Sequence, residues 1–169
     1  MSVRKLAIAA GVSHNAPYMH FQDRDALIAA IAAAGFQDLQ ETITRASDAS
    51  EPDWQHRFKA GCHAYVMFAI QHPVRYATMH LGFDPDTHPE THAASIRAFG
   101  QLKQHLADGQ KAGAIKDMDT HQMAIGVWAS LHGLSGILRR PSGKHPISGM
   151  PAEDILEDTL DLLLHGIAA

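Results

Sequence analysis

The apolar residues of this chain follow helical spacing over almost its whole length, and this pattern restricts its fold more than any other feature. Alanine and leucine dominate, runs of β-branched residues are missing, and no segment keeps the alternation of a strand. We therefore expect an all-α fold. The expected helices span residues 3–9, 13–20, 23–46, 52–71, 73–81, 89–112, 118–139 and 151–167.

The size and composition fit a globular protein. The 169 residues suffice for one domain, or one domain with a small appendage, that buries a proper core. Apolar residues make up 46% and charged residues 19%, so the chain is not disordered. No apolar run reaches the roughly 18 residues of a membrane span. Cys62 is the single cysteine and cannot form an internal disulfide, so we expect a cytoplasmic protein with no membrane partner.

The charge is unevenly distributed. A formal charge of −4 argues against a protein that coats nucleic acid through bulk electrostatics. Residues 1–27 nevertheless carry three basic and two acidic side chains, whereas residues 151–169 carry five acidic side chains and no lysine or arginine. Any contact with nucleic acid is therefore expected at the N-terminal end.

Residues 2–21 match the plan of a helix-turn-helix. Two short helices are expected there, separated by a turn that contains Gly11, and the second helix of such a pair enters the major groove of DNA. Ser13 is the expected N-cap of this second helix. Pro17 then removes only the first intrahelical hydrogen bond, which costs well below the roughly 3 kcal/mol of an interior proline.

The outward side of the second helix carries side chains that suit DNA. Asparagine pairs with adenine edges, histidine reaches phosphates or base edges, and alanine packs on the thymine methyl group. The residues expected to face DNA are His14, Asn15, Ala16, Met19 and His20.

The stretch VRKLAIAAGVSHNAPYMHFQDRDALIAAI resembles the DNA-binding signature of the tetracycline-repressor (TetR/AcrR) family of transcriptional regulators. The matching positions are Leu6-Ala7, Ala10 to Ser13, Tyr18, His20-Phe21 and Leu27. The resemblance implies that Tyr18 both packs and offers its hydroxyl to a phosphate, and that Arg24 contacts a phosphate. Ser13 and Ser2, which can cap the first helix, complete the set expected at the DNA.

The resemblance also implies a covering helix. Family members carry a further helix before this motif, packed across the helix-turn-helix pair, but here one residue precedes Ser2. Without a cover, the apolar side of Val3, Leu6 and Val12 would face water. We expect that the sequence lacks an N-terminal segment; the alternative is a compromised DNA-binding unit. The expected domains are an incomplete DNA-binding domain at 1–46 and a helical ligand-binding and dimerisation domain at 47–169.

Two C-terminal helices suggest a homodimer, which the resemblance also implies. A stripe of small residues in 118–139 lets a second helix approach closely, and 151–167 is apolar over a wider face than one small core needs. Packing within one subunit explains either helix alone. The residues expected at the interface are Gly126, Ser130, Gly133, Ile137, Leu156, Leu160, Leu163 and Leu164.

A small-molecule site is expected in the same C-terminal part. The W-x-x-x-H-G pattern of Trp128, His132 and Gly133 is similar to one ligand-binding subclass of the family. Trp128 and His132 share a helix face, where they line a pocket or stabilise helix packing. Mixed aromatic, methionine and hydroxyl side chains suit a cavity for an apolar or amphipathic effector, although each is equally at home in a core. They are Phe58, Cys62, Tyr65, Tyr76, Met79 and Phe83.

Thirteen histidines raise the question of a metal site. His88 and His92 lie four residues apart with two aspartates nearby, and His56 and His63 lie two turns apart on one helix. These spacings fix no third ligand, and the HExxH motif is absent. We therefore expect scattered surface histidines, with no metal and no cofactor.

The leading hypothesis is a dimeric repressor that a small molecule releases from a palindromic operator in double-stranded DNA. A small helical enzyme or metal-dependent binder is one alternative, although a nucleophile–base pair, a phosphate loop and paired catalytic carboxylates are not recognisable. The other alternative is a ligand-binding dimer that has lost DNA binding. The sequence identifies neither the effector nor the operator.

Overall fold

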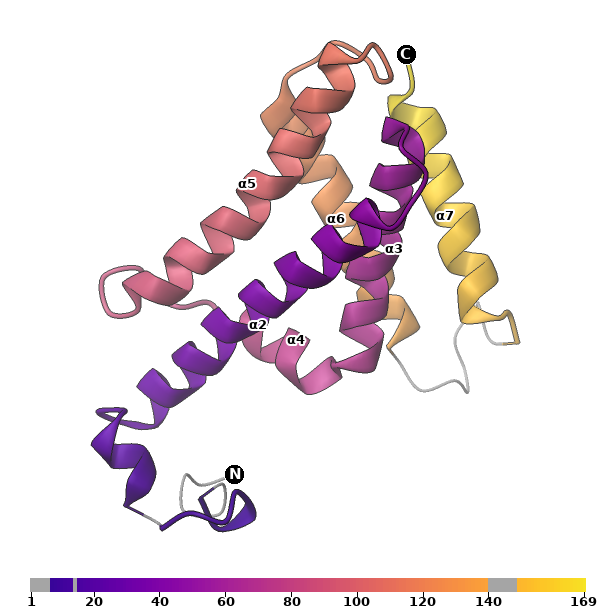
Figure 1. The fold of residues 1–169 in the computed structure, drawn as a ribbon. Helices are drawn as coiled ribbons and strands as arrows, with labels where there is room; N and C mark the ends of the chain where they lie inside the picture. Colours follow the sequence, from indigo (N-terminus) through magenta and orange to yellow (C-terminus); the bar gives the residue numbers. More distant parts are fainter. Residues whose placement is uncertain (1–6, 14, 140–148) are drawn as a thin grey trace.

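The computed structural model of this chain describes residues 7–13, 15–139 and 149–169 (Figure 1). Residues 7–9 are helical and a turn follows. The elements after them are η1 (Ala16–Met19), α2 (Arg24–Asp48), α3 (Trp54–Gln71), α4 (Pro73–Met79), α5 (Pro89–Lys111), α6 (Thr120–Leu138) and α7 (Ala152–Ile167). The all-α class is confirmed, and the six helices predicted from residue 23 onward match α2–α7 to within two residues at each end.

Extended pairing is limited, in the part of the chain that the structure describes, to an isolated antiparallel bridge between Ile115 and Ala168. It ties the end of α7 to the α5–α6 connection, where the Lys116 N–H donates to the Ile167 carbonyl at 2.9 Å. Over the same residues, no helix has both the length and the apolar character that a bilayer crossing requires.

The helices begin where the local chemistry supplies a cap. Before α2, the Asp23 carboxylate accepts the Ala26 N–H at 2.8 Å, and before α6 the Asp119 carboxylate accepts the Gln122 N–H at 2.8 Å. Prolines open α4 and α5, where a helix needs no N–H donor. Most boundaries could therefore be predicted from local sequence.

Helix α3 is the centre of the body and packs against α2, α4, α6 and α7. The largest side chains buried to 1% exposure or less are Val66, Tyr76, Leu106, Val127, Leu156 and Leu160. Helix α5 approaches α3 closely because Gly109 has no side chain: a Cβ there would lie 2.4 Å from the Trp54 ring. The Trp54 Nε1–H donates to the His105 carbonyl at 2.7 Å and fixes this contact.

Helix α2 links the two ends of the molecule (Figure 1). Its 25 residues, at about 1.5 Å per residue, make it about 37 Å long. Its first turns lie beside η1 and away from the body, while its second half packs on α3 and α5. Phe36 and Leu39 are core residues of the body, so α2 belongs to both regions.

Candidate functional site

The helical turn in the predicted recognition segment is shorter than expected. It begins at Ala16 after Asn15, whose side chain makes no capping hydrogen bond, so the prediction of Ser13 as the N-cap is wrong. A helix beginning after Ser13 would need a Pro17 N–H, and the proline ring would clash with the Ser13 carbonyl. That carbonyl instead accepts the Ala16 N–H at 3.0 Å. Pro17 sits in the first turn of η1, where its missing N–H breaks no bond.

Most of the side chains predicted to face DNA are exposed. Asn15 is exposed just before η1, Met19 is exposed at its last position and His20 just after it, whereas Ala16 is half-buried. The amide and imidazole groups predicted to meet DNA are thus at the surface. Ser2 and His14 lie outside the described residues.

Arg24 is the first residue of α2. Its guanidinium lies 3.9 Å from the Asp25 carboxylate, and both side chains are more than half exposed. Such a pair is weak, so Arg24 can exchange it for a phosphate at little cost.

The apolar back of the segment is exposed, as expected for Val12. The exposed fractions are 66% for Ile8 and 47% for Val12, whereas Ala7 is buried. Tyr18 packs only partly, with 55% of its surface accessible. Val3 and Leu6, expected to share this face, lie outside the described residues.

A cavity of about 560 Å³ lies within the helical body. Side chains of α2, α3, α5 and α6 line it, together with residues from Met79 to Phe83. Its volume falls in the range of small-molecule sites, and its walls are mostly apolar.

Most of the side chains predicted to bind a ligand lie at this cavity. Those that line it are Phe58, Cys62, Tyr65, Met79, Phe83 and Trp128. Tyr76 and His132 are absent from the lining and lie behind it. For His132 the structure therefore agrees with the alternative of a hydrogen-bonded residue within the helix packing.

The sequence did not predict two of the helices that line the cavity, α2 and α5. Helix α2 contributes Phe36, Leu39, Gln40 and Ile43, and α5 contributes, among others, Ile96, Phe99, Leu102 and His105. The α2 residues were expected to belong to the DNA-binding domain. Their spacing of three, four and seven residues marks one helix face, but it does not distinguish a cavity wall from a core.

The cavity wall carries no formal charge: none of its described lining residues is Asp, Glu, Lys or Arg. Burial lowers the pKa of His80 and His105 below the usual histidine range, so both are neutral at neutral pH. Burial also raises the pKa of the Cys62 thiol to about 12, so this thiol is not a reactive thiolate. The cavity is an uncharged, mainly apolar space with a few hydrogen-bonding groups.

A chain of hydrogen bonds joins the cavity to α6. The Tyr65 hydroxyl at the cavity lies 2.6 Å from the Tyr76 hydroxyl, which lies 2.8 Å from His132 Nδ1. The Arg139 guanidinium packs over the Tyr76 ring, 4.8 Å from its centroid. The chain therefore connects α3, α4 and α6 through three side chains.

The small-residue stripe of α6 faces outward. Gly126, Ser130, Gly133 and Ile137 are exposed, and within the described residues a Cβ at Gly126 or Gly133 would meet no atom within 4 Å. This surface is accessible to a partner helix.

Helix α7 requires a correction. Leu156 and Leu160 are each 1% exposed and belong to the core of their own subunit, so the prediction that they form an interface is wrong. Leu163 and Leu164 are half-buried. Leu162, which the prediction omitted, is 75% exposed. Leucines occur on several faces of α7, so its sequence does not show which face packs internally.

The histidines considered for metal binding are dispersed. His56 Nδ1 pairs with the Asp53 carboxylate at the start of α3. The Asp84 carboxylate caps its own loop, accepting N–H bonds from Asp86 at 2.9 Å and Thr87 at 3.0 Å. Neither the His88–His92 pair nor His56 belongs to a converging ligand group in the described residues.

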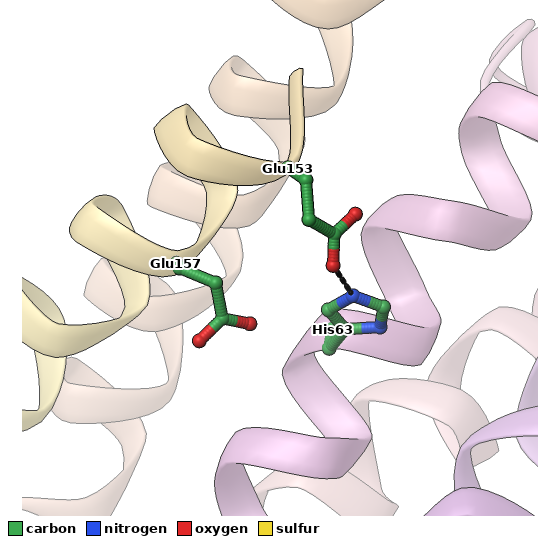
Figure 2. A group of neighbouring side chains, drawn as sticks. All are labelled: His63, Glu153 and Glu157. Atoms are coloured by element: carbon green, nitrogen blue, oxygen red, sulfur yellow. Dashed lines mark hydrogen bonds and ion pairs between the residues drawn. The ribbon is translucent and has the colours of Figure 1, made fainter. Parts of the chain in front are cut away.

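His63, Glu153 and Glu157 are the described residues whose ligand atoms do converge, within 4.8 Å of one another. Figure 2 shows His63 on α3 facing the two glutamates on α7, with Nε2 2.8 Å from Glu153 Oε1. The Lys59 ammonium already pairs with Glu157 at 2.8 Å and would repel a cation there. The group is best explained as a polar contact that ties α7 to α3.

A family model described as "Tetracyclin repressor-like, C-terminal domain" matches residues 58–168, which is more than half of the chain. The chain belongs to the tetracycline-repressor family. The part matched contains α3 after its first turn and all of α4–α7, and hence three sides of the cavity. The narrower likeness to the W-x-x-x-H-G subclass stays a prediction.

Two solved structures share the fold of this tetracycline-repressor family member. A solved Rhodococcus sp. RHA1 protein of unknown function is 30% identical, with a TM-score of 0.86 over 100% of this chain and 86% of its own. The TetR family regulator PfmR from Thermus thermophilus shares the fold, with a TM-score of 0.75, 23% identity and coverage of 98% of this chain and 88% of its own.

Among curated proteins, the HTH-type transcriptional regulator Rv1816 of Mycobacterium tuberculosis is 27% identical over 123 residues. The match covers 70% of this chain and 53% of that regulator, so the chain spans about half the length of the relative. The name describes a transcriptional regulator and gives no support to the enzyme alternative.

Proposed function

We propose that the protein is a cytoplasmic, ligand-responsive, homodimeric transcriptional regulator. In this proposal it represses transcription from a palindromic operator and is released by a mainly apolar or amphipathic effector. The observation that carries the proposal is the position of α2. One helix runs from the exposed η1 segment to the wall of the 560 Å³ cavity, so a molecule in the cavity contacts the element that positions the DNA-reading side chains.

Contacts of α4 with α2 support a mechanical link. Gly35 of α2 lies against Met79, since a Cβ there would be 2.8 Å from the Met79 Cγ. The Arg75 guanidinium pairs with the Asp38 carboxylate one turn further along α2. A ligand that displaces Met79 would therefore push on α2, and it favours release only when it binds the released state more tightly.

A second contact holds α2 to α5. The buried Thr91 hydroxyl of α5 donates to the Ala29 carbonyl at 2.9 Å. We propose DNA-reading and ligand-binding units at residues 1–46 and 47–169, with α2 crossing the boundary. Movement of α2 relative to α5 would then tilt η1 and the residues beside it, which form the proposed DNA-reading segment.

The proposed dimer brings two reading segments together. The exposed stripe of α6 and the exposed Leu162 of α7 support this proposal, because a two-fold interface brings the same exposed patch of both subunits together. A dimer whose reading segments lie one DNA turn apart recognises half-sites with that spacing.

The proposal is tested by selecting bound duplexes from a random pool with the full-length protein. A palindromic consensus is expected, with affinity that falls steeply as salt increases. Changing Arg24→Ala should weaken binding to all sequences and reduce the salt slope by about 2, because each of the two subunits loses one phosphate contact. Arg97→Ala, which removes an exposed guanidinium from α5, is the matched control. Selection without any sequence preference would instead support a ligand-binding dimer that does not read DNA.

A further inference from the structure

The Tyr65 hydroxyl has an unusual position at the cavity. The Tyr65 side chain is 7% exposed, lies in the cavity wall, and is bonded from behind by Tyr76. Burial raises the pKa of both tyrosines above the usual range, so both hydroxyls keep their protons. The Trp128 side chain also bonds this hydroxyl and opposes the rise in its pKa. A neutral hydroxyl has one donor and two lone pairs, so with these two partners it retains one position for a molecule in the cavity.

Three other polar side chains of the wall already have hydrogen-bond partners. The Thr91 hydroxyl donates to Ala29, the Ser95 hydroxyl donates to the His92 carbonyl at 2.7 Å, and Gln101 Nε2 donates to Thr44 at 2.7 Å. These groups already stabilise helices and contacts between helices. Tyr65 differs because it and its partner are both hydroxyl groups, so the direction of the bond between them can reverse.

The wall also selects against charge. A charged group moved from water into this space would lose its hydration, and no Asp, Glu, Lys or Arg in the lining would compensate for that loss. An uncharged group that forms one hydrogen bond avoids this penalty.

We propose that the cavity takes an uncharged, mostly apolar molecule whose polar group bonds to the Tyr65 hydroxyl, and that His132 sets the direction of this bond through Tyr76. When His132 Nδ1 accepts from Tyr76, Tyr76 accepts from Tyr65, and Tyr65 offers a lone pair to the ligand. When Nδ1 carries a proton, each bond reverses and Tyr65 donates to the ligand. The proposal rests on the function proposed above.

The groups around His132 determine its protonation. Tyr76 and His80 of α4 face its ring, with the His80 centroid at 4.6 Å, and Trp128 lies at 5.4 Å on its own helix. Burial and the Arg139 charge lower the pKa of His132. Both tautomers of neutral His132 are therefore available at neutral pH, and acid leaves only the arrangement in which Tyr65 donates.

Matched three-ring probes separate these effects. Fluorene has no polar group, fluorenone only accepts, carbazole only donates, and fluorene-2-carboxylate is charged. The full-length protein should bind fluorenone and carbazole about tenfold more tightly than fluorene at neutral pH, and the carboxylate most weakly. On acidification, carbazole should lose its advantage while fluorenone keeps it.

Three variants assign the residues. Tyr65→Phe should make fluorene, fluorenone and carbazole bind alike, and the fold is retained because Tyr76 keeps its bond to His132. Tyr76→Phe should keep the preference for polar probes but abolish its pH dependence. Thr78→Val, which removes an α4 hydroxyl bonded to the Val74 carbonyl, should change neither. Thermal melting checks that each variant is folded.

The outcomes are distinguishable. A preference for fluorenone that persists in Tyr65→Phe, or carboxylate binding as tight as that of fluorene, overturns the inference while leaving the cavity as a ligand site. If none of the probes binds, the proposed effector site itself fails. If Tyr76→Phe retains the wild-type pH dependence, His132 does not act on the ligand through the Tyr76 and Tyr65 hydroxyls.

Discussion

Truncating Leu162 should separate the proposed dimer without unfolding the subunit. Leu162 is 75% exposed on α7, so its side chain contributes little to the core of its own subunit. Leu162→Ala removes about three methyl or methylene groups, worth about 0.8 kcal/mol each when fully buried. We scale this energy by the exposed fraction of Leu162 and count it twice, because a two-fold dimer contains two copies of the residue. The free energy of dimerisation should then weaken by about 3–4 kcal/mol. The dimer Kd should therefore rise a few hundredfold.

Sedimentation equilibrium measures this Kd directly. Val74→Ala is the matched control, because Val74 is 79% exposed but lies on α4, outside the proposed interface. It should leave the Kd unchanged. Urea unfolding of either variant, measured at a concentration low enough that the subunits are separate, should shift by less than about 0.5 kcal/mol per subunit. An unchanged Kd for Leu162→Ala would refute the assignment of this face to the dimer.

Three further predictions concern stability. Burial lowers the pKa of His80 and His105, so below about pH 6.5 the unfolded chain binds protons that the folded chain does not. The free energy of unfolding, measured by urea titration, should therefore be constant above about pH 6.5 and fall below that pH. Gly109→Ala should cost about 1–3 kcal/mol in the same assay, because the new methyl group displaces the Trp54 ring. Asp23→Ala should weaken the start of α2 by about 1 kcal/mol, seen as faster hydrogen exchange of its first amides, while exchange in α6 is unchanged.

The helices could be predicted because their signals are local. Periodic apolar residues, aspartate caps and opening prolines act within a few residues of each boundary, and α2–α7 follow them. The turn η1 departs from the prediction for a local reason as well. Pro17 cannot complete a helix that begins after Ser13, and this steric effect outweighs the capping preference of serine.

The cavity could be predicted only in part because its walls are distant in the sequence. Tyr65 and Trp128 were identified by residue type, but Phe36 and Phe99 face the same space only once α2 and α5 pack around α3. The α7 leucines show the same limit. Helical periodicity does not distinguish the internal position of Leu160 from the exposed position of Leu162, because leucine occupies both faces.

The central claim is that the cavity and the DNA-reading segment are coupled through α2. The most direct test measures, by fluorescence anisotropy, the affinity of the full-length dimer for a selected duplex with and without a saturating compound from a thermal-shift screen. Coupling through α2 should weaken DNA binding at least about fivefold when the compound is bound, and should weaken binding of the compound by the same factor when DNA is bound. A compound shown by Tyr65→Phe to occupy the cavity, yet leaving DNA affinity unchanged, would contradict the account.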